Sequence, residues 1–405
     1  MEVDILNIPK LRFKEFTDEW VYYKYKDIFN LNQGLQIPIT ERFLDYAPNR
    51  FFYITNEFLK PSSKKSYYIE NPSPNVICTK EDILMTRTGN TGKVITNIAG
   101  VFHNNFFRIK YNPKNFNKDF ICCILNQNKI QNKILTLAGN STIPDLNHKD
   151  FYSIKSRFPK LKEQEKIAKF INTVDKKIEN IENTISSLEN QKKGLLQQIF
   201  SQKLRFKDEN GNNYPNWKEN IESIKILSGN MYPTTSYINK PGILLIQGIN
   251  ITPNKLLLND CIYISNDYNE INHVIVKKGD ILLGLNRPLI NNQLKICLFD
   301  KDFAYLYQRA GILSFNKLKI NSLFLYQYLQ TDSFKKHLQV ELVGSDQPYI
   351  KSNIFNKIKL IFPCLEEQTK IADFLSAFDR KLDNQKAQLE HWQQIKKGLL
   401  QQMFV

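Results

Sequence analysis

The stretch FPKLKEQEKIAKF at residues 158–170 recurs as FPCLEEQTKIADF at residues 362–374, and the string KKGLLQQ closes both copies, at 192–198 and at 396–402. The offset between the copies is 204 residues throughout (362 − 158 and 396 − 192), and 20 of the 43 aligned positions are identical. Chance does not produce a repeat of this kind. The chain therefore consists of two structural units in tandem.

Within each copy, apolar residues recur in steps that alternate between three and four residues, which is typical of the seam of a left-handed coiled coil. About 38 residues at roughly 1.5 Å each make a helix near 57 Å long. The alternative is an amphipathic helix on a globular core, but two helices of matched length favour a helix pair. The predicted seam residues are Ile167, Ile171, Val174, Ile178, Ile181, Ile185, Leu188 and Leu195 in the first copy, and Ile371, Leu375, Phe378, Leu382, Leu389, Trp392 and Leu399 in the second, with Lys192, Gln385 and Lys396 as polar exceptions.

A second repeat precedes each half of the chain. The string KLRFK occurs at residues 10–14 and at 203–207, and each copy is followed by a tryptophan, Trp20 and Trp217. The first predicted helix runs directly into the second KLRFK, whereas the second helix ends with the chain. We therefore expect the N-terminal string to complete the second helix and the two ends of the chain to lie close together.

These repeats predict a pseudo-two-fold molecule with antiparallel helices and one globular domain at each end. The expected boundaries are 1–157 for the first domain, 158–203 for the first helix, 204–361 for the second domain and 362–405 for the second helix. Short apolar runs such as 243–246 and 274–276 indicate strands, and 120–134 and 322–338 indicate helices. The predicted fold class is α/β (α+β).

The composition indicates a partner of negative charge. The chain has 56 Lys+Arg against 40 Asp+Glu, a formal net charge of +16. A basic balance favours a polyanion whose binding weakens with salt. AT-rich coding also enriches lysine and asparagine, so charge alone leaves both explanations open.

The sequence contains no pattern that signals a cofactor, a metal or a membrane span. The six cysteines form no CxxC motif and the five histidines are isolated, which predicts reduced thiols in the cytoplasm. Walker, GxGxxG, HExxH and GxSxG motifs are all missing from the sequence. The string DQPY at 346–349 is similar to the Asp/Asn-Pro-Pro-Tyr loop of amino-methyltransferases, but Gln347 replaces the first proline, and a turn shaped by Pro348 is the favoured interpretation.

The repeated strings resemble the specificity subunits of type I restriction-modification systems. The resemblance is carried by Pro-x-Leu-x-Glu-Gln at each helix start, by the KKGLLQQ closing strings and by the Leu-Arg-Phe…Trp entry to each domain, and it covers the chain in the right order. It implies two target-recognition domains that each read half of a bipartite asymmetric DNA site, with the helices setting the spacer. It also implies two methyltransferase subunits along the helices and two motor-nuclease subunits. S-adenosylmethionine, ATP and Mg²⁺ would belong to these partners, and this chain would be non-catalytic, with no cofactor of its own.

Two pairs of polar segments are the candidates for DNA contact. Arginine suits a bidentate contact to guanine, and asparagine or glutamine suits adenine. Polar turns without DNA contact are the alternative. Lysines outside the seam (Lys166, Lys169, Lys176, Lys177) would face either the spacer phosphates or solvent. The candidate DNA-binding residues are Arg87, Thr88, Asn90, Lys93, Ser141 and Thr142 in the first domain, and Asn286, Arg287, Ser345, Gln347 and Tyr349 in the second.

The competing function is a non-catalytic coiled-coil adaptor or decoy scaffold without a DNA target. It explains the long helices but not two divergent domains in a near-cyclic duplication. A self-contained methyltransferase or nuclease would need a cofactor or metal motif. The recognition subunit is therefore the predicted function.

Overall fold

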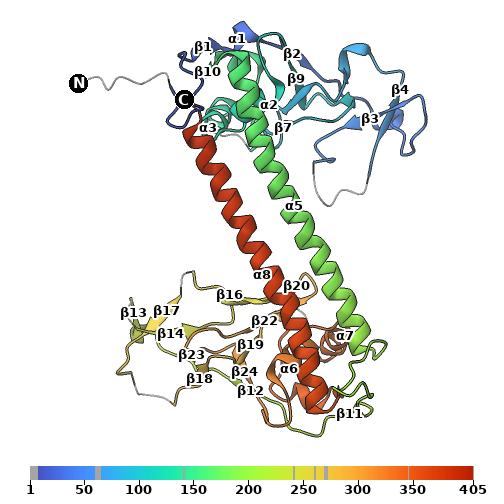
Figure 1. The fold of residues 1–405 in the computed structure, drawn as a ribbon, viewed down its shortest axis with the longest axis vertical. Coiled ribbons are helices and arrows are strands. Elements are labelled where there is room, and N and C mark those ends of the chain that lie inside the picture. The colour runs from blue at the N-terminus through green and yellow to red at the C-terminus, as the bar shows by residue number, and fades with distance from the viewer. Residues whose placement is uncertain are drawn as a thin grey trace. The chain divides into compact units, whose positions relative to one another are not determined.

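The computed structural model describes residues 8–59, 65–139, 142–239, 242–259, 261–268, 272–344 and 346–404. The chain divides into two compact units, one made of residues 1–182 and 387–405 and the other of residues 183–386. Two long helices, α5 (Leu161–Phe200) and α8 (Leu365–Gln402), each run through both units. Each unit therefore contains part of both helices and one α/β domain (Figure 1).

The domain of unit 1 carries two four-stranded sheets, in the orders β2-β9-β6-β7 and β4-β3-β8-β5, and a two-stranded sheet of β1 and β10. Its elements are β1 (Val21–Lys24), α1 (Tyr25–Ile28), β2 (Phe29–Gln33), β3 (Arg50–Ile54), β4 (Tyr68–Glu70), β5 (Ile77–Cys78), β6 (Ile83–Thr86), β7 (Val94–Ile95), β8 (Gly100–Phe102), β9 (Phe106–Tyr111), α2 (Lys118–Leu125), α3 (Asn128–Ala138), α4 (His148–Ser153) and β10 (Lys155–Phe158).

The domain of unit 2 repeats this plan, with sheets β12-β24-β19-β22, β13-β17-β14-β23-β18 and β11-β25. In both units the second sheet contains one parallel pair, β3 with β8 and β14 with β23. The elements are β11 (Lys218–Glu219), β12 (Lys225–Ser228), β13 (Tyr237–Ile238), β14 (Ile243–Ile246), β15 (Ile251–Thr252), β16 (Lys255–Leu256), β17 (Ile262–Ile264), β18 (Ile275–Lys277), β19 (Ile281–Gly284), β20 (Leu289–Ile290), β21 (Gln293–Leu294), β22 (Ile296–Leu298), β23 (Phe303–Leu306), β24 (Ala310–Ser314), α6 (Ser322–Tyr328), α7 (Asp332–Glu341) and β25 (Ile361–Phe362).

The predicted helices at 120–134 and 322–338 are each two helices in the structure, so that prediction was too coarse. α2 ends at Leu125 and α3 begins at Asn128, while α6 ends at Tyr328 and α7 begins at Asp332. The side chain of Thr331 caps α7 by accepting a hydrogen bond from the backbone of Phe334. Because the apolar spacing continues across both breaks, periodicity alone does not reveal the turns between the helices.

Within each unit the two long helices run antiparallel and pack together. In unit 1, Asp175 of α5 pairs with Lys396 of α8 at 2.5 Å. In unit 2, Lys192 pairs with Asp379 at 2.5 Å, and Lys386 pairs with Glu189. The two lysines that interrupt the predicted seam therefore form ion pairs between the helices. Such pairs favour one register, because a slip would leave a partly buried charge unpaired.

The predicted seam residues divide into buried and half-buried sets. The ends of the helices lie in the domain cores: Ile167 and Ile171 pack in the core of unit 1, and Ile371 and Leu375 in that of unit 2. The helices thus serve both as partners of each other and as amphipathic helices on globular cores. Buried are Ile167, Ile171, Val174, Ile181, Leu188, Ile371, Leu375 and Leu382, and half-buried are Ile178, Ile185, Leu195, Phe378, Leu389, Trp392 and Leu399.

A buried carboxylate at the start of each long helix holds the entry segment of the domain. In unit 1, Arg12 donates two hydrogen bonds of 2.7 Å to Glu163, and the indole of Trp20 donates a third at 3.3 Å. The ion pair raises the pKa of Arg12. The next residue, Gln164, accepts from the backbone of Asn117 and donates to the carbonyl of Pro159.

Unit 2 repeats these bonds residue for residue. Arg205 pairs with Glu367 at 2.7 Å, Trp217 donates to Glu367 at 3.2 Å, and Gln368 bonds the backbone of Asn321 and Pro363. The Glu-Gln pair of the repeated motif is therefore a clamp between helix and domain.

In the structure, the N-terminal KLRFK string follows the end of α8 in the same way that the second KLRFK string follows the end of α5. In unit 2 the amide of Leu204 donates to the carbonyl of Gln198 at 3.0 Å, where α5 continues into the second KLRFK. In unit 1 the amide of Leu11 donates to the carbonyl of Gln402 at 2.9 Å. The prediction that the N-terminal string completes the second helix is confirmed, because the same bond forms across the break in the chain.

Replacing Arg12 with methionine would leave the Glu163 carboxylate buried without its cation. Removing one partner of a buried ion pair costs about 3–5 kcal/mol, so the free energy of unfolding should fall by about that amount in urea denaturation. Lys10→Met, two residues away at an exposed position, is the control and should change it by less than about 0.5 kcal/mol. Equal losses in the two variants would show that the bond between Arg12 and Glu163 does not stabilise the fold.

Candidate nucleic-acid interface

Two loops of unit 1 that carry predicted DNA-binding residues lie side by side. The carbonyl of Arg87, just after β6, accepts from the amide of Leu146 at 2.9 Å, and Thr88 forms a β-bridge with Asp145. Thr91 donates to the carbonyl of Pro144 at 2.8 Å. The segments 87–93 and 142–146 are therefore one surface, although the sequence presents them as separate candidates.

The side chain of Arg87 is already engaged within this surface. Its guanidinium forms a bidentate ion pair with Asp145, with distances of 3.0 and 2.5 Å, and Thr88 donates to the same carboxylate. The Arg87 hydrogen bonds lower the pKa of Asp145. Burial, with a smaller contribution from Arg87, lowers the pKa of the neighbouring His148. Arg87 is thus held in a fixed orientation rather than extending freely into solvent.

The rest of the loop 87–93 is a tight turn. Gly92 has a φ of +89°, and a Cβ there would lie 2.8 Å from Oε1 of Gln131, whose amide donates to the Gly92 carbonyl. The turn leaves Asn90 and Lys93 exposed. Thr142 is also exposed, whereas the candidate Ser141 lies outside the described residues.

Unit 2 forms the same backbone arrangement with different side chains. The carbonyl of Leu285 accepts from the amide of Ile350 at 2.9 Å, and Asn286 forms a β-bridge with Tyr349. Leu285 and Tyr349 thus occupy the positions of Arg87 and Asp145. A charged pair in one domain is replaced by a leucine and a tyrosine in the other, on an unchanged framework.

Arg287 is an exposed cation of this surface. It is exposed, its φ is +44°, and its amide donates to the carbonyl of Pro348 at 2.7 Å. The structure records no ion pair between Arg287 and a described carboxylate. Gln347 is also exposed, and Ser345 lies outside the described residues. A left-handed backbone is uncommon for arginine and indicates that the surrounding bonds hold it there.

Unit 2 inserts a short hairpin where unit 1 has the tight turn. β20 and β21 pair as Leu289 with Leu294 and Ile290 with Gln293. The two connecting residues, Asn291 and Asn292, both have positive φ, as a type I′ turn requires. The Asn-Asn pair directly after the apolar Leu289 and Ile290 is the signal that would have predicted this hairpin.

Lys295 is a residue that the sequence reasoning missed. Its carbonyl accepts from Gly284 as that of Lys93 does from Thr86, so the two lysines are equivalent. Lys93 is exposed, but Lys295 is buried at 9% exposure, and its ammonium donates to the carbonyl of Asn286 at 3.3 Å. Gly284 makes the space, because a Cβ there would lie 2.7 Å from Cε of Lys295.

Arg309 was also missed. The amide of Leu285 donates to its carbonyl at 3.0 Å, as the amide of Arg87 donates to that of Asn105. The offset of 204 between Asn105 and Arg309 could have paired them. Arg309 is exposed with a φ of +67°, beside the turn that carries Arg287.

The lysines outside the predicted seam differ among themselves. Lys166 forms an ion pair with Glu15 and lies over the ring of Phe13. Lys169, Lys176 and Lys177 are exposed. Over the ranges given above, no group of three His, Cys, Asp or Glu side chains comes together as a metal site, and no described helix is long and apolar enough to cross a membrane.

Paired loops on two α/β domains, joined by long helices, define a protein with two recognition surfaces. The chain matches the family of type I restriction modification DNA specificity domains at residues 17–190 and again at 206–391. It therefore belongs to this family, as a DNA specificity subunit with two target-recognition domains and a non-catalytic component of the restriction enzyme. The resemblance stated from the sequence and the predicted fold class are confirmed.

Two curated relatives are similar to the chain along nearly its whole length, and a solved structure is similar to it in fold. The chain is 27% identical to the type I restriction enzyme MjaVIII specificity subunit of Methanocaldococcus jannaschii, over 97% of this chain and 94% of that protein. It is 25% identical to the putative MjaX specificity subunit of the same organism, over 97% and 95%. The fold is similar to that of the S subunit from M. genitalium, with a TM-score of 0.64, 17% identity and coverage of 98% and 99%.

Lys295→Met tests the buried ammonium. Burial lowers the pKa of Lys295 in the folded state, so the unfolded chain binds more protons between that pKa and the ordinary value of about 10.4. The stability of the wild-type protein should therefore rise with pH through this window. The methionine variant should be more stable at neutral pH and lose this part of the rise, as measured by urea denaturation from pH 7 to 10. Lys93→Met, at the exposed equivalent position, should change neither quantity.

Proposed function

We propose that each domain reads one half of a bipartite asymmetric DNA site and that the two long helices set the length of the unread spacer. In this proposal the first half-site is contacted by Arg87, Thr88, Asn90, Lys93, Ser141 and Thr142, and the second by Asn286, Arg287, Ser345, Gln347 and Tyr349. Arg309 joins the second set.

The observation that carries the proposal is the pair of equivalent loop surfaces. The bonds from Leu146 to Arg87 and from Ile350 to Leu285 place the same backbone in both domains, at 2.9 Å in each. The side chains they display differ in charge, size and hydrogen bonding. A constant framework with exchanged side chains suits two domains that bind the same kind of polymer but read different bases.

The position of Arg87 in the loop surface of unit 1 supports a direct contact between its guanidinium and a base edge. Asp145 orients the planar guanidinium of Arg87, and an oriented guanidinium loses less rotamer entropy when it bonds a base edge. The exposed Asn90 and Lys93 flank it for amide and phosphate contacts. In unit 2, no carboxylate among the described residues pairs with Arg287, and Tyr349 supplies an apolar face beside it.

The proposed complex contains further subunits. A type I system assembles the specificity subunit with DNA and partner subunits. We propose two methyltransferase subunits and two motor-nuclease subunits, which hold S-adenosylmethionine, ATP and Mg²⁺. The proposed location is the cytoplasm, where the DNA substrate lies.

Single-molecule methylome sequencing tests the function directly. The chain is expressed with its methyltransferase subunit in a host that lacks restriction, and a strain without the chain is the control. A new methylated motif with two defined halves is expected. Soluble complex formation without a new motif would favour the adaptor or decoy scaffold.

Arg87→Ala and Arg287→Ala should act on opposite halves of that motif. Each lost bidentate contact to a base costs about 1–3 kcal/mol of discrimination, which is roughly a five- to 150-fold loss. Arg87→Ala should relax the first half-site alone and Arg287→Ala the second alone, in methylome sequencing and in competition binding with half-site variants. If each variant weakens both halves equally, these arginines contact phosphates or support the fold instead.

A change in the length of one long helix should alter the spacer and not the half-sites. An insertion of a few residues in the middle of α5, about 1.5 Å each, would shift one recognition surface along the duplex. The expected motif keeps both half-sites with a new number of unread bases between them. An unchanged spacer in an active variant would mean that the helices do not measure it.

A further inference from the structure

The ion pair between Arg87 and Asp145 leaves one edge of the guanidinium free. Arg87 uses Nε and Nη2 to bond the carboxylate, at 3.0 and 2.5 Å. A guanidinium carries five N–H donors in a fixed plane, so one donor on Nη2 and both donors on Nη1 remain. The structure records no hydrogen bond from Nη1 to a described residue. The free donors therefore lie along the Nη1–Nη2 edge, which adjoins the edge that Asp145 occupies.

The carboxylate of Asp145 keeps one acceptor position. Oδ1 accepts from Nε of Arg87 and from the hydroxyl of Thr88, and Oδ2 accepts from Nη2 of Arg87. An ionised carboxylate offers about four lone-pair positions and no donor. The hydrogen bond from Arg87 is the first cause of the lowered pKa of Asp145, so this group is ionised at neutral pH. Its side chain is 45% exposed, so a ligand can reach the remaining lone pair of Oδ2.

Across the ion pair, the free groups have a fixed order: a donor at Nη1, a donor at Nη2 and an acceptor at Oδ2. The major-groove edge of a G·C pair presents the complementary order, with acceptors at N7 and O6 of guanine and a donor at N4 of cytosine. An A·T pair places the N6 donor of adenine opposite a donor of Arg87. The reversed pair, C·G, opposes donor to donor at one end and acceptor to acceptor at the other. The order therefore favours G·C over the other three pairs.

We propose that Arg87 and Asp145 together read one G·C base pair of the first half-site. Arg87 donates from Nη1 to N7 and from Nη2 to O6 of the guanine. Asp145 accepts at Oδ2 from the N4 amino group of the paired cytosine. Asp145 is thus a specificity-determining residue, in addition to orienting Arg87. The inference rests on the proposed function, in which this loop surface contacts the first half-site.

The equivalent surface of unit 2 lacks this set of three groups. Leu285, which is only 7% exposed, and Tyr349 occupy the positions of Arg87 and Asp145. Arg287 lies two residues after Leu285, and no carboxylate among the described residues pairs with it. A guanine that Arg287 contacts in the second half-site would therefore have no carboxylate on its cytosine. The second domain is a natural comparison for the contact made by Asp145.

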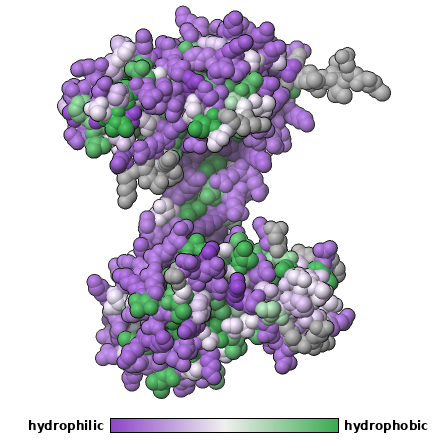
Figure 2. Space-filling model, turned by 180° about the vertical axis from the view of Figure 1, so that it is seen from behind, coloured by the Kyte–Doolittle hydropathy of each residue, from purple (hydrophilic) through white to green (hydrophobic). Residues whose placement is uncertain are grey.

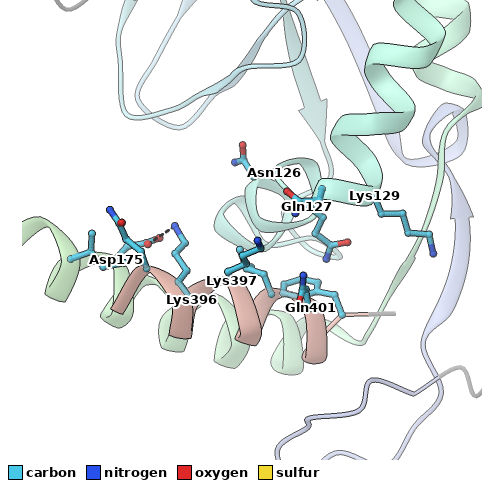
Figure 3. A pocket seen from close by; sticks show the side chains of 12 residues that line it. Asn126, Gln127, Lys129, Asp175, Lys396, Lys397 and Gln401 are labelled. Atoms are coloured by element: carbon cyan, nitrogen blue, oxygen red, sulfur yellow. Dashed lines mark ion pairs between the residues drawn. The ribbon is translucent and has the colours of Figure 1, made fainter. Parts of the chain in front are cut away.

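The order of donors and acceptors, and not polarity alone, distinguishes the Arg87–Asp145 pair. Hydrophilic side chains cover most of the visible face of each unit (Figure 2). An aspartate also pairs with a cation in the pocket that Figure 3 shows, where Asp175 bonds Lys396 at 2.5 Å. The lysine ammonium is a compact charge without a planar fork of donors. That pair therefore does not present an ordered edge to a base pair.

Base-pair substitution tests the proposed preference. The position to vary is the one at which Arg87→Ala relaxes the methylated motif. Competition binding by the complex of this chain with its methyltransferase subunit compares duplexes that carry G·C, C·G, A·T or T·A there. The wild-type complex should prefer G·C over each other pair by about fivefold or more. Asp145→Ala should reduce this preference without weakening the binding of the other three duplexes, because it removes a negative charge and no contact to them.

Two modified bases separate the contacts of the two residues. 7-Deazaguanine lacks the N7 acceptor. N4-methylcytosine still pairs with guanine, but its methyl group replaces the amino hydrogen that faces the major groove. The first base should weaken binding by the wild-type complex and not by Arg87→Ala. The second should weaken binding by the wild-type complex, by about fivefold or more, and not by Asp145→Ala.

Two controls accompany the modified bases. Asp27→Ala removes an exposed carboxylate of the same domain and should respond to both bases as the wild type does. N4-methylcytosine opposite the guanine that depends on Arg287 should leave wild-type binding unchanged. Equal weakening by N4-methylcytosine in the wild type and in Asp145→Ala would overturn the inference, because the methyl group would then act by its size.

The remaining outcomes separate this inference from the proposed function. Sensitivity to 7-deazaguanine without sensitivity to N4-methylcytosine overturns the contact from Asp145 and leaves it a positioning residue of Arg87. A bipartite motif with a pair other than G·C at the position that depends on Arg87 also overturns the inference, while the proposed function stands. The absence of any new methylated motif would instead contradict the proposed function itself.

Discussion

The buried carboxylates of Glu163 and Glu367 are the constraint on which the rest of the structure depends. Each accepts hydrogen bonds from an arginine and a tryptophan of the segment that leads into its domain. A carboxylate removed from water is costly unless its oxygens are paired. The start of each long helix therefore cannot separate from its domain without exposing three bonded groups. These bonds tie the entry segment to the start of the helix within each unit.

This clamp explains how the loop side chains can differ between the two domains while the packing of helix and entry segment stays the same. The Glu-Gln motif, the interhelical Lys-Asp pairs and the backbone bond between Leu11 and Gln402 recur in both units at fixed offsets. The paired loop surfaces follow the ends of β6 and β19. A charged pair at Arg87 and Asp145 and an uncharged pair at Leu285 and Tyr349 can therefore occupy one backbone arrangement. The loop side chains can therefore differ between the domains without a change in the clamp.

The repeat allowed the architecture to be predicted from the sequence. The 204-residue offset, the apolar period and the order of KLRFK and KKGLLQQ predicted two domains, two packed helices and adjoining chain ends, because duplicated strings at matched positions leave few other folds. Helix breaks at Asn126 and Leu329 were missed, since apolar spacing continues through them. The hairpin at Asn291 and Asn292 was also missed, although its two asparagines are a turn signal.

The sequence by itself determined the class of protein and the types of residue at its loops, since these depend on local strings and their spacing. Only the tertiary structure decided which loop residues share a surface, because the contact of Arg87 with Asp145 joins residues 58 positions apart. It also decided the role of each lysine. Lys93 and Lys295 occupy equivalent positions, yet one is exposed and the other is buried above Gly284. Whether a side chain is buried depends on the space that residues distant in sequence leave around it. A local sequence pattern does not contain that information.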